Sequence, residues 1–162
     1  MSSQHKNLSA FDRSLFPDAS DMRIGIVVSE WNNEVTHALF NGAIETLKSL
    51  GCPEINIIRH NVPGSFELPL AASWMIEKEN PDAVICIGCV IQGETRHFDF
   101  ICEAVAKGIM DLGLRTSVPV IFGVLTPENQ QQAIDRAGGR YGNKGVEAAQ
   151  TAVKMVALRN QK

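Results

Sequence analysis

The sequence predicts a protein of the α/β class: a three-layer α/β/α sandwich in which a four-stranded parallel sheet carries helices on both faces. Short apolar runs rich in Val and Ile alternate with longer segments of helical apolar spacing, which gives the order βαβαβαβαα. Strands that alternate with helices pair in parallel through right-handed crossovers. Residues 22–162 are predicted to form this single domain, and residues 1–21 a polar arm in front of it.

The first predicted strand is residues 22–28, an almost uninterrupted apolar run of the kind expected for a buried parallel strand. Residues 35–50 predict a helix, because their apolar residues follow helical spacing and Asn32 or Asn33 is a suitable N-cap. A second strand is predicted over residues 54–61, and the Pro-Gly pair that follows prevents its simple continuation.

The middle of the chain repeats this alternation. Residues 68–79 predict a second helix with an apolar face, and residues 82–88 predict a third strand. The strongest helical pattern of the chain lies between residues 98 and 112. These elements place the third strand between two crossover helices.

The last third of the chain begins with a fourth strand over residues 118–125. Thr126, followed by proline, predicts the N-cap of a short helix that runs through Arg136. The glycine-rich segment 138–145 then separates this helix from a last one over residues 146–156.

Composition excludes several classes of protein. The chain has 15 Lys and Arg against 18 Asp and Glu, a net charge of −3, which argues against binding to nucleic acid. It has no apolar run long enough for a membrane helix, and its first 22 residues lack the apolar core of a secretory signal. Four cysteines without such a signal favour a reduced cytoplasmic location. Charged residues make up only 20% of the chain, so we expect another subunit to cover part of the surface.

A ligand site is expected where the parallel strands end, because ligands of open α/β sheets bind beyond the carboxyl ends of the strands. The loops there are residues 29–34, 61–67 and 89–97. They bring together two aromatic rings, a carboxylate, a basic pair and a hydroxyl: Trp31, Phe66, Glu67, Thr95, Arg96 and His97. The rings could stack on a planar heteroaromatic ligand, and an anion could sit at the helix N-terminus. Each residue taken alone also has an ordinary structural interpretation, such as a ring that covers the core.

Other motifs do not predict a site. Cys86 and Cys89 are three residues apart on a strand, so their side chains point to opposite faces and cannot form a disulfide or chelate a metal. The glycine-rich segment 138–145 lacks the Gly-Lys-Ser/Thr ending of a phosphate-binding loop and follows a helix. No Gly-x-Gly-x-x-Gly follows the first strand, so a dinucleotide site is not predicted.

Four segments together resemble the lumazine synthase family: Val62-Pro63-Gly64-Ser65-Phe66-Glu67-Leu68-Pro69, Gly93-x-Thr95-x-His97-Phe98-Asp99, Pro119-Val120-Ile121-Phe122-Gly123-Val124-Leu125-Thr126 and Gly142-Asn143-Lys144-Gly145. They occur in the family's order, and the resemblance covers about residues 20–158. It implies the condensation of 5-amino-6-(ribitylamino)uracil with 3,4-dihydroxy-2-butanone 4-phosphate. The product would be 6,7-dimethyl-8-ribityllumazine, the precursor of riboflavin, formed without a cofactor or metal.

The resemblance also implies roles for individual residues. Trp31 matches the family's ring under the pyrimidine, and Phe122 would reach the pocket of a neighbouring subunit. His97 would transfer protons. The ribityl chain and the pyrimidine would be held by Ser65, Phe66, Glu67, Val90 and Ile91, and the phosphate by Glu94, Thr95 and Arg136. Glu94 departs from the family, in which small and hydroxyl residues are frequent, so a carboxylate stands beside the expected phosphate.

The resemblance implies a homo-oligomer as well. The family forms pentamers, and shell-forming members have a short link ending in Gly-Asn-Lys-Gly, as this chain has from Arg136 to Gly145. We therefore favour twelve pentamers in a 60-subunit shell over a free pentamer, with the N-terminal arm docked on a neighbouring subunit. Riboflavin synthase is a candidate partner.

Two kinds of non-enzymatic protein with the same flavodoxin-like architecture are disfavoured as alternatives. An electron carrier would need a Ser/Thr/Gly-rich phosphate loop after the first strand, and residues 29–34 (SEWNNE) are not such a loop. A phospho-acceptor domain would need an Asp at the end of the third strand, where this chain has Gly88-Cys89. A riboflavin synthase of this fold, or a lumazine-binding relative without activity, remains open.

Overall fold

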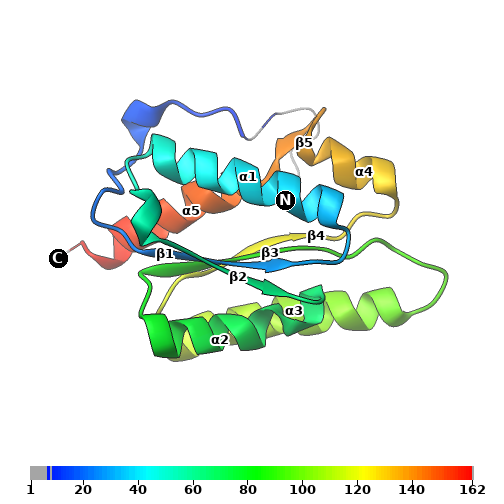
Figure 1. Ribbon diagram of the computed structural model, residues 1–162. Helices are drawn as coiled ribbons and strands as arrows, with labels where there is room; N and C mark the ends of the chain where they lie inside the picture. The colour runs from blue at the N-terminus through cyan, green and yellow to red at the C-terminus, as the bar shows by residue number, and fades with distance from the viewer. Residues whose placement is uncertain (1–6, 8, 162) are drawn as a thin grey trace.

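In the computed structural model, which describes residue 7 and residues 9–161, a parallel sheet lies between two layers of helices (Figure 1). The strand order is β2-β1-β3-β4, with α1 and α5 on one face and α2 and α3 on the other. The strands are β1 (Ile24–Ser29), β2 (Ile57–Val62), β3 (Ala83–Cys89) and β4 (Val120–Leu125). The long helices are α1 (Asn33–Ser49), α2 (Leu68–Glu79), α3 (His97–Thr116) and α5 (Lys144–Arg159). The predicted fold class is confirmed.

The register of the sheet places all four strand ends at one edge. Ser29 at the end of β1 pairs with Val62 at the end of β2, and Cys89 pairs with Leu125 across β3 and β4. The two inner strands, β1 and β3, are buried along their whole length, whereas the edge strands are partly exposed. The loops that the sequence singled out therefore lie on a common rim.

All four strands begin one to three residues later than predicted, and the structure gives the reason at the first two. The first starts at Ile24 rather than Met22, and the Arg23 amide donates to the side chain of Asp82 at 2.8 Å before the ladder begins. Residues 54–56 form a 3₁₀ turn (η2, Glu54–Asn56), so β2 is shorter than the predicted segment. A distant side chain at Arg23 and a local turn bond at Asn56 thus take backbone groups that the apolar pattern had assigned to the sheet.

The long helices form where they were predicted, whereas the short helix before the glycine-rich segment begins later than predicted. Residues Leu68–Glu79 match the prediction at both ends, and α1 has Asn32 as its N-cap in the left-handed conformation. The prediction of Thr126 as N-cap is wrong: α4 (Gln130–Asp135) is capped by Asn129, whose side chain accepts the Gln132 amide at 3.0 Å. The segment before it is used at the rim, where the Pro127 carbonyl accepts a hydrogen bond from the third loop.

The glycine-rich segment is more than a link. It forms an antiparallel hairpin of β5 (Ala137–Gly139) and β6 (Gly142–Asn143), which the sequence analysis missed. Gly138 and Gly142 have φ of 115° and 83°, a region that favours glycine. These two residues allow the chain to turn tightly between α4 and α5.

Two apolar cores lie on the two faces of the sheet. Ile24, Ile26 and Val28 of β1 face the core under α1 and α5, and Val27 faces the core under α2 and α3. Cys86 and Cys89 lie in different cores, so the prediction that they point to opposite faces is confirmed. This alternation follows from the two-residue period of a strand.

The described part of the N-terminal arm packs on its own chain. Phe11 and Phe16 meet edge to face with ring centroids 5.1 Å apart, and both contact the core under α1 and α5. The predicted docking on a neighbouring subunit also concerns residues 1–6 and 8, which lie outside the described residues. Within residues 7 and 9–161, no helix is long and apolar enough to cross a membrane.

Candidate active site

Backbone hydrogen bonds join the loops after β1 and β2. The Glu30 N–H donates to the Val62 carbonyl at 2.8 Å, and the Trp31 N–H donates to the Pro63 carbonyl at 3.1 Å. These bonds continue the β1–β2 pairing past the ends of the strands. The loop that carries Trp31 is therefore held by the same kind of interaction that holds the sheet.

The third loop is joined to its neighbours on both sides. Asn32 donates its side-chain amide to the Cys89 carbonyl at 2.9 Å, which ties the first loop to the third. The Val90 amide donates to the last residue of β4, and the Gln92 amide donates to the Pro127 carbonyl, both at 2.9 Å. The rim is thus one hydrogen-bonded unit from β2 to β4.

Trp31 is an exposed aromatic residue supported by a glycine. Its side chain is 66% exposed, far more than a core residue of this size. A Cβ at Gly64 would lie 2.6 Å from both Cε3 and Cζ3 of the indole, so the ring rests directly on the Gly64 backbone. The exposed part of the ring is available for stacking on a planar ligand.

Three consecutive residues after Gly64 form the turn η3 (Ser65–Glu67) and point in different directions. Ser65 is buried against Gly88 at the end of β3. Phe66 is 55% exposed, and half-buried Glu67 accepts the Gly64 N–H through Oε2 at 3.0 Å. One carboxylate oxygen of Glu67 is thus committed to the backbone, and the other is available to a hydroxyl.

The third loop contributes apolar residues first and polar residues after them. Val90 and Ile91 are half-buried; Val90 packs on the core under α2 and α3, and Ile91 packs on the core under α1 and α5. Glu94, Thr95 and His97 are exposed. The loop therefore closes the end of the sheet with Val90 and Ile91 and presents titratable groups beyond it.

The N-terminus of α3 is open to solvent. The N-cap residue Arg96 makes no side-chain hydrogen bond to the helix, and the Thr95 hydroxyl accepts the His97 amide at 3.4 Å, a long bond. Because α3 is 20 residues long, unpaired amides and the helix dipole give this end a partial positive charge. An anion would be stabilised there.

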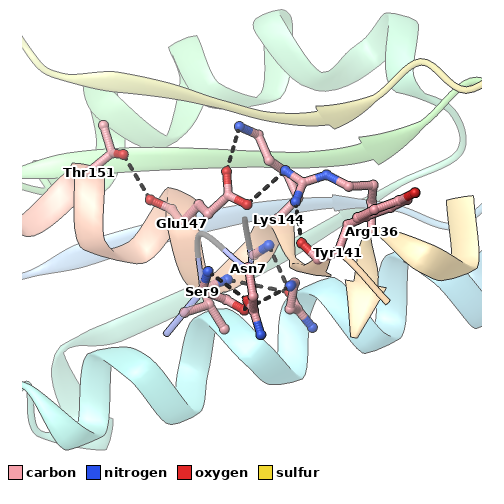
Figure 2. A network of polar contacts seen from close by, with 10 residues as sticks. Asn7, Ser9, Arg136, Tyr141, Lys144, Glu147 and Thr151 are labelled. Carbon is pink, nitrogen blue, oxygen red and sulfur yellow. Dashed lines mark hydrogen bonds and ion pairs between the residues drawn. The ribbon is translucent and has the colours of Figure 1, made fainter. Parts of the chain in front are cut away.

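Arg136 lies in a cluster of charges that the sequence analysis missed (Figure 2). Its guanidinium donates to the Tyr141 carbonyl and to Glu147 Oε1, both at 2.7 Å. Lys144 pairs with the other carboxylate oxygen of Glu147 at 3.2 Å. We call Arg136, Lys144 and Glu147 the cationic cluster, because two cations and one carboxylate leave one net positive charge.

The side chains of the cationic cluster are largely covered. Glu147 is 12% exposed, Arg136 25% and Lys144 30%, so solvent screens the charges only in part. One sequence signal could have indicated the Lys144–Glu147 pair: a Lys followed three residues later by a Glu at the start of a predicted helix. Among the described residues, Arg136 contacts this cluster and not the predicted phosphate residues Glu94 and Thr95.

Phe122 does not lie at the rim of its own chain. It is half-buried on the edge strand β4 and lines a groove of about 500 Å³ between α3 and α5. Met110, Leu114 and Leu158 line the same groove and are 58–74% exposed. An exposed apolar surface of this kind marks an interaction site.

The two thiols of β3 are buried. Burial raises the pKa of Cys86 to about 12 and the pKa of Cys89 to about 11, so both stay protonated near neutral pH. Within the part of the chain that the structure describes, no three His, Cys, Asp or Glu side chains are grouped as metal ligands.

Comparisons with known proteins agree on one family. The family described as 6,7-dimethyl-8-ribityllumazine synthase matches residues 21–160. A protein of this name from Cytophaga hutchinsonii is 59% identical over 97% of this chain and 98% of its own length. Another from Flavobacterium johnsoniae is 57% identical over 99% of this chain and 85% of its own length. A third, from Parabacteroides distasonis, is 52% identical over 96% of this chain and 98% of its own length.

Proposed function

This chain belongs to the 6,7-dimethyl-8-ribityllumazine synthase family, and we propose that the rim formed by the ends of β1–β4 is its active site. The protein is a transferase of riboflavin biosynthesis. It condenses 5-amino-6-(D-ribitylamino)uracil with 3,4-dihydroxy-2-butanone 4-phosphate and releases 6,7-dimethyl-8-ribityllumazine, phosphate and water. The observation that supports the site assignment is the hydrogen-bonded rim that joins the loop of Trp31 to the turn of Glu67 and to the third loop, which leads to His97.

The pyrimidine substrate binds in the part of the rim made by the first three loops. Trp31 stacks on the ring, and Val90 and Ile91 line the pocket with their backbone. Glu67 hydrogen-bonds the ribityl hydroxyls, together with the backbone of Ser65 and Phe66. The support for this arrangement is the exposure of the indole and the orientation of Glu67 by the Gly64 amide.

The phosphorylated substrate binds where positive potential is available. The open N-terminus of α3 at Glu94 and Thr95 provides backbone amides, and Arg136 provides a guanidinium. The cationic cluster supports this role, since its unbalanced charge is stabilised by an anion. Glu94 contributes its backbone, with its exposed carboxylate directed away from the phosphate.

His97 moves protons during the reaction. Imine formation, phosphate elimination and ring closure each transfer a proton near neutral pH, and an imidazole is the side chain most often used for such transfers. The position of His97 in the first turn of α3 brings it next to the proposed phosphate site. Holding two reactive substrates together supplies much of the remaining rate enhancement.

The active site is shared between subunits of a pentamer. Phe122 lines a groove at the β4 edge, away from its own rim, so it serves the site of a neighbouring subunit. Twelve pentamers form a 60-subunit shell, since the link from Arg136 to Gly145 has no insertion. The enzyme works in the cytoplasm, where a riboflavin synthase uses its product.

One assay tests the proposed function directly. Purified protein is incubated with both substrates, and lumazine is followed by its absorbance and fluorescence. Formation of lumazine supports the proposal. Binding of lumazine without turnover would identify a relative that has lost activity, and consumption of added lumazine would identify a riboflavin synthase instead.

The assembly is tested separately by sedimentation of dilute protein. A mass near sixty chains supports the shell, and a mass near five chains at all concentrations and in phosphate buffer leaves only the pentamer. A monomer that forms lumazine would exclude the shared site.

A further inference from the structure

The described N-terminal arm touches the β5–β6 hairpin at one point. The Ser9 hydroxyl accepts the backbone N–H of Asn143 at 3.1 Å, and it donates to Asn7 Oδ1 at 2.5 Å. Asn7 also accepts the Ser9 amide at 3.0 Å, so the hydroxyl is held in one orientation. Figure 2 shows Asn7 and Ser9 beside the residues of the cationic cluster.

The hairpin is shaped to receive the arm. The side-chain oxygens of Asn7 and Ser9 occupy the space that a Cβ at Gly142 would need. Gly142 has a φ of 83°, which also favours glycine over other residues at this position. The arm therefore seats directly on the backbone of the residue before Asn143.

Asn143 connects the arm to two helices. Its side-chain oxygen accepts the Gly145 and Val146 amides at 2.8 and 3.3 Å and so caps α5. Its side-chain amide donates to the Ala38 carbonyl of α1 at 2.9 Å. Asn143 thus hydrogen-bonds to the arm through its backbone, and to α5 and α1 through its side chain.

The capped end of α5 carries the cationic cluster. The Lys144 N–H donates to the Arg136 carbonyl at 2.9 Å, immediately after Asn143. Glu147 lies in the first turn of α5 and orients the Arg136 guanidinium. A shift of Asn143 would therefore move the backbone of Lys144 and the anchor of Arg136 at the same time.

A second contact fixes the arm farther along α5. Lys154 lies over the Phe16 ring at 4.2 Å from its centroid, and Phe16 packs on the core under α1 and α5. The arm is thus held at the middle of α5 by Phe16 and at its N-terminus by Ser9.

We propose that this part of the arm is a positioning strap: Ser9, supported by Asn7, holds Asn143 so that Arg136 is oriented for the phosphorylated substrate. Ser9 touches no reacting atom and acts through the β5–β6 hairpin and Glu147. The inference rests on the proposed phosphate role of Arg136. It assigns to the arm a function within its own chain.

Ser9→Ala tests the strap, with KM measured for each substrate. We expect KM for 3,4-dihydroxy-2-butanone 4-phosphate to rise about two- to tenfold, the effect of one lost hydrogen bond to the backbone, with KM for the pyrimidine unchanged. Inorganic phosphate should inhibit this variant correspondingly less. Ser9→Thr keeps the hydroxyl and should restore the parent value, and Ser14→Ala is a matched change on the same arm that makes no contact with the hairpin.

Two further measurements separate the possible failures. Hydrogen exchange of the 136–147 segment should be faster in Ser9→Ala, because the Asn143 amide loses its acceptor. If Arg136→Ala raises KM for the phosphorylated substrate and Ser9→Ala does not, the strap is wrong and the phosphate assignment stands. If Arg136→Ala leaves that KM unchanged, the phosphate assignment fails and the strap with it. Equal increases in KM for both substrates in Ser9→Ala would also overturn the proposal.

Discussion

Gly64→Ala is expected to weaken pyrimidine and product binding by displacing the indole of Trp31. A Cβ at Gly64 would lie 2.6 Å from two indole carbons, whereas ordinary contact begins near 3.4 Å, so the ring must retreat by about 0.8 Å. Gly64 has a φ of −132° and a ψ of 177°, which alanine adopts without strain, so the effect is steric and not conformational. A stacked ring contributes about 0.5–1.5 kcal/mol, and partial loss of stacking should weaken affinity by up to about tenfold.

The assay is isothermal titration calorimetry with lumazine, which measures affinity equally in variants with and without Trp31. The double variant Gly64→Ala/Trp31→Ala distinguishes the mechanism. If Gly64 acts through the ring, the double variant binds no more weakly than Trp31→Ala alone. A further loss in the double variant would assign the effect to Glu67, whose Oε2 lies 3.1 Å from the same Cβ position. Unchanged affinity in Gly64→Ala would refute the reasoning.

Three other predictions follow from the site and the core. His97→Ala should lower kcat by at most about 10²–10⁴-fold and leave the melting temperature unchanged, because His97 is exposed; a pH–rate profile identical to the parent's would remove it from proton transfer. Arg136→Ala should chiefly raise KM for the phosphorylated substrate, by about 1.5–3 kcal/mol in binding free energy, and steady-state kinetics in which only the pyrimidine KM rises would contradict this. Burial raises the pKa of Cys86 to about 12, above its value in the unfolded chain, so its contribution to the free energy of unfolding is complete below about pH 8.5 and is lost as the pH rises toward 12. The free energy of unfolding, measured in urea, should therefore fall less between pH 8 and pH 10.5 in Cys86→Ala than in the parent chain. An equal fall in both proteins would exclude the effect.

The order of strands and helices could be predicted because it depends on local pattern. A buried parallel strand must be apolar on both sides, and α2, with its apolar face, was predicted at both ends. The rim followed from topology, since four parallel strands end at one edge whatever their side chains are. The contacts made by Trp31 and Glu67 there could not be predicted, because both involve Gly64, a residue without a side chain of its own.

The errors occurred where a short segment is decided by distant partners. Thr126 has the sequence of an N-cap, but Pro127 is held by Gln92 of the third loop and the helix begins later. The glycine content of residues 138–145 predicts only a break between two helices, yet the segment forms a hairpin whose Asn143 is hydrogen-bonded to the arm and to α1. Local propensity is a weak prior that such tertiary contacts override.

By itself, the sequence determined the fold class, the family and the residue types at the rim, because apolar periodicity and ordered motifs are properties of the chain alone. Only the tertiary structure decided which charges meet. Arg136 and Glu147 lie in different elements 11 residues apart, Ser9 lies at the other end of the chain, and no periodicity relates the three. They are brought together because α5 packs against α1 with the arm across its end, so the balance of charge in the cationic cluster is a consequence of packing and not of any one segment.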